Sequence, residues 1–180
     1  MLQKTRGIVL HYLKYSESSI ISHVYTEKFG RLSLISSGFK GKNAKNKIIY
    51  FQPLSLVEVD VYLKQSNEVH RIKEIKPYVP LYQLSGNMVK GAIAIFIAEL
   101  LYKTIHEKEP NPEMYSFLES AIQYLEHVGE GTPNFHLVFI IQYMKLLGIF
   151  HWPIFMKWKG RIHQEDIKIF GRTVFSIFSG

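Results

Sequence analysis

Hydrophobic and polar positions alternate in short runs along the first 76 residues. The clearest run covers residues 57–64, where three valines and a leucine alternate with polar or aromatic residues. A period of two with one polar face predicts a strand. Weaker runs predict strands near residues 8–12, 20–24, 32–35 and 69–75. Five short strands with no long helical pattern between them predict a small barrel. The oligonucleotide-binding (OB) fold is the common five-stranded form, and an SH3-like barrel is the nearest alternative.

The pattern becomes helical in the second half of the chain. Apolar residues recur at spacings of three and four within residues 92–101, 117–125 and 137–147. Asn111 is a capping residue and Pro112 suits a first turn, so together they predict where the second helix begins. These spacings predict a bundle of about three helices.

Periodicity and charge both change at a short segment that contains two prolines, residues 77–80. Proline favours extended backbone in the residue before it, so the segment is typical of a boundary. We predict fold class α+β, with a five-stranded OB-like β-barrel domain at residues 1–76 and a linker at 77–80. An α-helical domain would follow at 81–180, with an irregular tail from residue 151.

Composition excludes several classes of protein. The chain has no cysteine, and none of its eight histidines have the four-residue spacing of a helical zinc site, so we expect no metal and no cofactor. The longest uncharged apolar run, residues 91–98, is too short to cross a bilayer, so we expect no membrane contact. No carboxylate dyad or nucleophile motif is present, and we predict that the protein is not an enzyme.

Positive charge is concentrated in the predicted barrel. Residues 1–80 contain 13 Lys and Arg against 6 Asp and Glu, whereas residues 81–180 contain 9 of each class. Four lysines fall within residues 40–47, with no acid among them. A cluster of like charge beside a strand-rich fold is typical of a site for a polyanion, and nucleic acid is the polyanion we favour.

The candidate site is a glycine-rich basic loop between two strands. Its ammonium groups would follow a phosphate backbone, a nearby guanidinium would bind phosphate oxygens, and one ring would stack on a base. The predicted DNA-binding residues are Arg31, Phe39, Lys40, Lys42, Lys45 and Lys47. The alternative for the lysines is that they keep an exposed loop in water and block edge pairing. The alternative for rings such as Tyr25 and Phe51 is that they belong to the barrel core.

Two other functions are compatible with this pattern. A protein-interaction adaptor would use the basic barrel to bind acidic peptides and would not bind nucleic acid. Aromatic residues 152–158, next to further basic residues, would then form either core or a docking surface. A nuclease is the third possibility, but it would need clustered carboxylates.

Several ordered segments are similar to a known family. They are residues 5–10, 15–19, 26–32 and 38–42, and the third has the spacing Thr26-x-x-x-Gly30-Arg31-Leu32. Residues 52–54 and 146–148 also match. Together they resemble the N-terminal half of RecO, the bacterial recombination mediator and DNA repair family. The positions that match the family's basic element are Arg31, Lys40, Lys42 and Lys45.

The resemblance implies an OB domain followed by a helical domain in a cytoplasmic, nucleoid-associated protein. It also implies binding of single- and double-stranded DNA, annealing of complementary strands, and help for RecR in loading RecA. The acidic tail of single-stranded-DNA-binding protein is a further implied partner. Many relatives carry a four-cysteine zinc element that this chain lacks, so zinc binding is not inherited. Relatives usually continue past residue 180, and we expect either a truncated chain or a short member.

Overall fold

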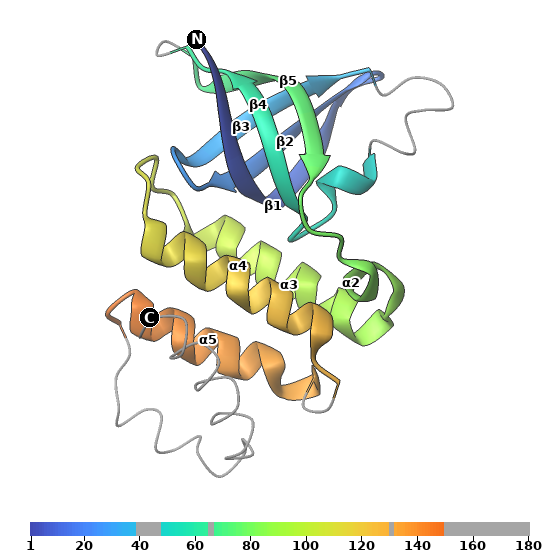
Figure 1. Ribbon diagram of the computed structural model, residues 1–180, viewed down its shortest axis with the longest axis vertical. Helices are drawn as coiled ribbons and strands as arrows, with labels where there is room; N and C mark the ends of the chain where they lie inside the picture. Colours follow the sequence, from blue (N-terminus) through green and yellow to red (C-terminus); the bar gives the residue numbers. More distant parts are fainter. Residues whose placement is uncertain (39–47, 65–66, 130–131, 150–180) are drawn as a thin grey trace.

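Five strands form a closed barrel at the N-terminal end of the computed structural model (Figure 1). The structure describes residues 1–38, 48–64, 67–129 and 132–149. The strands are β1 (Leu2–Ser16), β2 (Ser19–Thr26), β3 (Gly30–Ser37), β4 (Leu56–Tyr62) and β5 (Val69–Pro77). Their order around the barrel is β1-β2-β3-β5-β4, with β3 parallel to β5 and the other pairs antiparallel. The five predicted strands and the OB-like barrel are confirmed.

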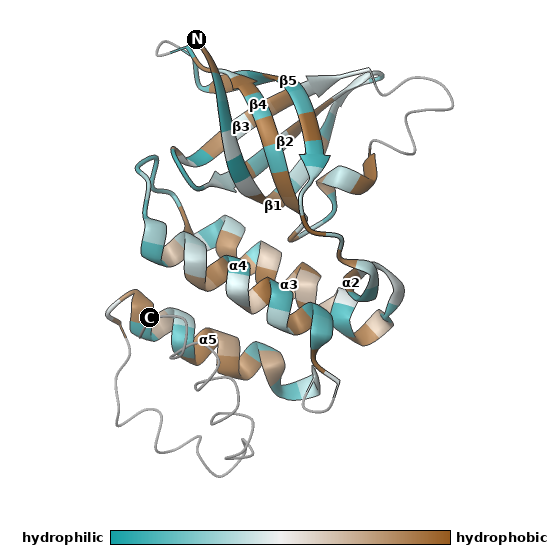
Figure 2. Ribbon diagram, in the orientation of Figure 1, coloured by the Kyte–Doolittle hydropathy of each residue, from teal (hydrophilic) through white to brown (hydrophobic). Residues whose placement is uncertain are grey.

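Alternation along the strands separates the barrel interior from its outer face. Val57, Val59 and Val61 of β4 are buried inside, whereas Glu58 and Asp60 between them face outward. Figure 2 shows this as bands of hydrophobic and hydrophilic positions along the strands. A short 3-10 helix, η1 (Ile49–Phe51), precedes β4 and buries Phe51.

Helices pack below the barrel in Figure 1. The helical elements are α2 (Tyr82–Gly86), α3 (Met88–Thr104), α4 (Pro112–His127), η2 (Thr132–Asn134) and α5 (Phe135–Leu146). Asn111 caps α4 as predicted, since its side chain accepts from the Met114 amide at 3.0 Å. The three predicted helices correspond to α3, α4 and α5. Within the described residues, none of the helices is long and apolar enough to cross a membrane.

The short helix α2 was not predicted, and a distant side chain explains it. The carboxylate of Glu126 on α4 accepts hydrogen bonds from the Gln83 and Leu84 amides at 2.7 and 3.0 Å. The ammonium of Lys90 on α3 donates to the Glu126 carbonyl at 2.6 Å. Because the cap lies 42 and 43 residues further along the chain, local sequence carries no sign of it.

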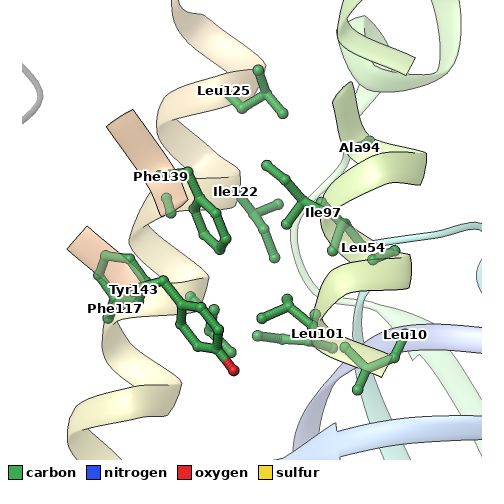
Figure 3. Close-up of a cluster of buried hydrophobic side chains, with 14 of the residues drawn as sticks. Leu10, Leu54, Ala94, Ile97, Leu101, Phe117, Ile122, Leu125, Phe139 and Tyr143 are labelled. Atoms are coloured by element: carbon green, nitrogen blue, oxygen red, sulfur yellow. The ribbon is translucent and has the colours of Figure 1, made fainter. Parts of the chain in front are cut away.

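One hydrophobic cluster joins the barrel to the helices. Ile8 and Leu10 of β1 and Leu54 before β4 belong to the same buried cluster as the inner faces of α3, α4 and α5. Val9, between Ile8 and Leu10, belongs instead to the cluster inside the barrel. Figure 3 shows Leu10 and Leu54 beside α3, with α4 and α5 on the other side of that helix. This stretch of β1 is thus buried on both faces, and each fully buried side chain stabilises the fold by about 1.5–3 kcal/mol.

The proposed boundary at residues 77–80 stays a prediction. Strand β5 ends at Pro77, and α2 begins at Tyr82. Tyr78 lies between them, and its hydroxyl donates to Glu119 Oε1 on α4 at 2.5 Å. Burial raises the pKa of Tyr78 well above its ordinary value, so the phenol stays protonated and can donate. The tail from residue 151 lies outside the described residues, as does the aromatic patch at 152–158.

Candidate nucleic-acid interface

Most of the predicted DNA-binding site lies outside the described residues. The segment 39–47 holds one ring and four ammonium groups of that site: Phe39, Lys40, Lys42, Lys45 and Lys47. The described chain before it ends at Gly38, whose amide donates to the Ser18 carbonyl at 3.0 Å. The segment is therefore joined to the barrel beside the turn between β1 and β2, and its role stays a prediction.

Arg31 is the predicted site residue that falls within the described part of the chain. Its Nη1 atom donates to the carbonyl oxygens of Tyr102 at 2.7 Å and Ile105 at 2.6 Å. Its guanidinium carbon lies 4.5 Å from the centroid of the Tyr102 ring. Carbonyls at the end of a helix lack partners within the helix, so Arg31 satisfies the C-terminal end of α3. A contact between Arg31 and a DNA phosphate stays a prediction.

The Thr26-x-x-x-Gly30-Arg31-Leu32 spacing has a structural explanation in the same place. The Thr26 hydroxyl donates to the Gly30 carbonyl at 2.8 Å and accepts from the Phe29 amide at 3.1 Å, which closes the turn before β3. Gly30 has φ +61°, and a Cβ atom there would lie 2.5 Å from the Glu109 carbonyl oxygen. Glycine therefore allows the connection between α3 and α4 to approach the barrel backbone. The motif docks the helices onto the barrel.

A row of directly paired residues crosses the outer face of the barrel. Leu13 pairs with Ile21, Ile21 with Ile35, and Ile35 with Arg71. Arg71 also pairs with Tyr62 on β4. Paired residues share a face of the sheet, so the five side chains form one strip, which we call the outer-face row. Leu13 and Tyr62 are 40% and 42% exposed, so both ends of the row are accessible to a ligand.

The helical part of the chain covers the neighbouring strip of this face. His11 pairs with His23, and the Tyr102 ring of α3 lies 4.7 Å from the His11 ring and 5.1 Å from the His23 ring. Burial, and then the charge of Arg31, lower the pKa of His23, so this imidazole is neutral at neutral pH. The helices thus cover the strip at His11 and His23 and leave the outer-face row uncovered.

Some cations of the barrel are paired with carboxylates. Glu58 Oε1 lies 3.0 Å from the Nζ atoms of both Lys4 and Lys76. Arg6 makes two contacts to Glu27, at 2.7 and 3.1 Å, and a longer one to Glu119 at 3.4 Å. The hydrogen bonds from Lys4 and Lys76 lower the pKa of Glu58, and the carboxylate therefore stays ionised. We call this set of residues the balanced ladder.

Other cations of the barrel have no carboxylate partner within the described residues. Besides Arg31, they are Lys14, Lys28, Lys64, Arg71 and Lys73. None of these five lysines and arginines was predicted from the sequence as a site residue. The alternation around the buried Ile72 was a usable signal, because it places Arg71 and Lys73 on the outer face of β5. The pairing of Arg71 with Ile35 was not visible, since it joins strands separated by the whole of β4.

The rings near the basic loop divide between core and surface. Tyr25 and Phe51 are buried, and burial raises the pKa of Tyr25 to about 12. Phe29 and Tyr50 are partly buried and pack against the barrel interior. Tyr25 and Phe51 are therefore core residues, and Tyr62 of the outer-face row is an exposed ring that was not predicted as a site residue.

Two family models match consecutive parts of the chain. Residues 1–80 match Recombination protein O N terminal, and residues 86–151 match Recombination protein O C terminal. The first match covers the whole barrel, and the second begins at the end of α2 and includes α3, α4 and α5.

Curated relatives carry the name DNA repair protein RecO. Those of Phocaeicola vulgatus and Bacteroides fragilis are 37% and 39% identical over 150 residues, which are 83% of this chain and 62% of each relative. That of Flavobacterium psychrophilum is 35% identical over 148 residues, 82% of this chain and 62% of the relative. The chain thus spans less than two thirds of the length of the curated relatives it matches.

Proposed function

The chain belongs to the RecO family of DNA repair proteins, and we propose on that basis that it acts in DNA repair and recombination by binding DNA. We propose that the protein is a mediator and not an enzyme. We further propose that the outer-face row and the lysine segment 39–47 form one DNA-binding surface.

The observation that carries this proposal is the composition of the outer-face row. It combines three aliphatic side chains and the exposed Tyr62 ring with Arg71, which has no carboxylate partner in the described chain. OB barrels bind oligonucleotides on the face of strands 2 and 3 and with the adjoining loops. Cations there hold phosphates, and rings stack on bases for about 1–3 kcal/mol each. The lysine segment follows β3 directly in the sequence, which is why we include it in the proposed surface.

Family membership supports finer proposals about partners. We propose that the surface binds single- and double-stranded DNA and anneals complementary strands. We also propose that the protein works with RecR in the RecA pathway and contacts the acidic tail of single-stranded-DNA-binding protein. A cytoplasmic, nucleoid-associated location follows from these partners.

The test is a binding measurement on a charge-reversed loop. Lys40, Lys42 and Lys45 are changed together to Glu, and affinity for a fluorescent 30-nucleotide DNA is measured by anisotropy. We expect binding to be abolished with a nearly unchanged thermal midpoint. For the unchanged protein, four or five phosphate contacts predict a slope of log affinity against log salt of roughly −3 to −3.5 on single strands.

Two outcomes would count against the proposal. Unchanged affinity in the triple variant would remove the lysine segment from the site. Binding of an acidic peptide, without binding of DNA by the unchanged protein, would identify an adaptor instead. The single variant Lys103→Glu, on exposed α3 surface, serves as the control for a change of charge elsewhere.

A further inference from the structure

A groove of about 860 Å³ lies between the barrel and the connection from α3 to α4. One side is formed by Leu63 and Lys64 after β4 and by His70 at the start of β5. The other side is formed by the α3–α4 connection, which rises beside the β2–β3 turn in Figure 1. Arg31 and Ser33 at the start of β3 lie between the two sides. The groove shares no residue with the outer-face row.

The wall contributed by the α3–α4 connection is held firmly. The Arg31 amide donates to the Glu107 carbonyl at 2.9 Å, while the Arg31 guanidinium binds the end of α3. Gly30 lets the backbone at Glu109 approach closely. These backbone contacts mean that the groove is formed before any ligand arrives, which lowers the entropy cost of binding.

Basic side chains outnumber acidic ones in this groove. Lys28, Arg31, Lys64 and Lys108 line it, against Glu68 and Glu109. Lys28 Nζ donates to the Lys4 carbonyl at 3.1 Å, and Arg31 donates to carbonyls as described. A carbonyl is a neutral acceptor, so it fixes the position of a cation and leaves its charge available. Within the described residues, Lys64 and Lys108 have no carboxylate partner.

Apolar groups lie in the same groove as these cations. Phe29, Leu63 and Pro110 form part of the lining. A ligand that fits must combine fixed negative charge with a flat apolar part, which is the chemistry of a nucleotide. We propose that the groove is a second nucleotide-binding site, with Lys28, Lys64 and Lys108 on the phosphate and the apolar wall against the base.

The site is independent of the proposed function, because it uses none of the outer-face row or of segment 39–47. The nucleotide would come either from a DNA strand or from free nucleoside phosphates. Amide NMR shifts of Phe29, Ser33 and Asn67 report on the groove, and those of Ile21 and Ile35 report on the row. The titrants are a four-residue oligothymidylate and, separately, ATP.

The test compares Lys64→Glu/Lys108→Glu with Arg71→Glu. Both lysines are exposed, so we expect the double variant to fold with an unchanged thermal midpoint. We expect oligonucleotide binding at the groove to weaken by about tenfold or more in the double variant and to persist in Arg71→Glu. Shifts with ATP alone would identify free nucleotide as the source and would still support the site.

Groove amides that respond to neither titrant would overturn the inference, whatever happens at the row. A response that survives Lys64→Glu/Lys108→Glu unchanged would also overturn it. If the row fails to bind DNA while the groove responds, the proposed function fails and this inference stands. If an acidic peptide changes the NMR shifts of the groove amides and neither nucleotide does, the groove binds a different class of ligand and the inference is wrong.

Discussion

The balanced ladder and the groove are two collections of cations on the same barrel, and they differ in what holds them. In the ladder, Lys4 and Lys76 both contact Glu58 at 3.0 Å. In the groove, Lys28 and Arg31 are held by backbone carbonyls. A carboxylate cancels most of the field of the cation it binds, whereas a carbonyl leaves that field in place.

The comparison shows why a count of charges does not locate a binding site. The barrel half of the sequence carries a large excess of Lys and Arg, yet Lys4, Arg6 and Lys76 are neutralised by acids. The field available to a polyanion comes from the cations that have neutral partners or none. In the described part of the barrel these are the groove cations, Arg71 of the outer-face row, Lys14 and Lys73.

Replacing Arg31, one of the groove cations, is expected to have the largest effect on stability. Arg31→Ala leaves the Tyr102 and Ile105 carbonyls without their charged donor, which we expect to lower the free energy of unfolding by about 2–4 kcal/mol. Urea denaturation measures this effect. Lys4→Ala on the ladder is the control and should hardly move the transition, because that ion pair is exposed to solvent.

Arg31→Lys sharpens the result, since it keeps the charge but loses the planar stacking on Tyr102. An intermediate loss of stability fits the docking role. An unchanged denaturation curve for Arg31→Ala, together with weaker DNA binding, would instead return Arg31 to the set of DNA ligands.

Gly30→Ala is expected to have the second largest effect. The positive φ disfavours any residue with a Cβ atom, and this Cβ would meet the backbone of Glu109. We expect a loss of about 1–3 kcal/mol in the free energy of unfolding. Gly86→Ala is the matched control, because a Cβ there meets nothing within 4 Å. Equal stability of the two variants would show that the close approach at Gly30 is not required.

Glu58→Gln is expected to have the smallest effect, and it tests the ladder directly. The change frees the charges of Lys4 and Lys76 without moving them far. We expect DNA binding at low salt to tighten by about two- to threefold, because the barrel gains uncompensated positive field. Anisotropy with the 30-nucleotide DNA measures it. Weaker or unchanged binding would mean that the ladder field does not reach the DNA.

The pH dependence of stability provides an internal control for that variant. The hydrogen bond from Lys4, and then that from Lys76, lower the pKa of Glu58 below its ordinary 4.5. Asp60 and Glu74 are the other acids on this face. In the sheet register, Asp60 lies opposite Lys4 on β1 and Glu74 on β5. A depressed pKa stabilises the fold above pH 4.5, and that contribution is lost as pH falls through the folded-state pKa. The difference in thermal midpoint between the unchanged protein and the Glu58→Gln variant should therefore shrink below about pH 4.

Much of the fold could be predicted because its pattern is local. The valines of β4 alternate with acids, and Asn111 with Pro112 starts α4, so both elements are visible within a few residues. Helix α2 was missed because Glu126 caps it from α4. The burial of β1 on both of its faces around Val9 also could not be predicted from local sequence, because the helices that cover Ile8 and Leu10 come much later in the chain.

The candidate site shows the same division. Its basic character and its position after β3 follow from the sequence, and most of its lysines stay predictions. Arg31 was predicted to bind phosphate through its guanidinium, but its hydrogen-bond partners are carbonyls 71 and 74 residues away. Arg71 was not predicted as a site residue, and the sheet pairing alone places it beside Ile35.

The sequence by itself determined the strand and helix periodicities, the excess of positive charge in the barrel half and the resemblance to the RecO family. Each of these depends on residue types at short spacing, or on their sum. The tertiary structure alone decided which cations are cancelled, because an ion pair or a carbonyl contact forms between strands and helices that are distant along the chain. The docking role of the Thr26–Leu32 motif and the groove beside it depend on those distant contacts.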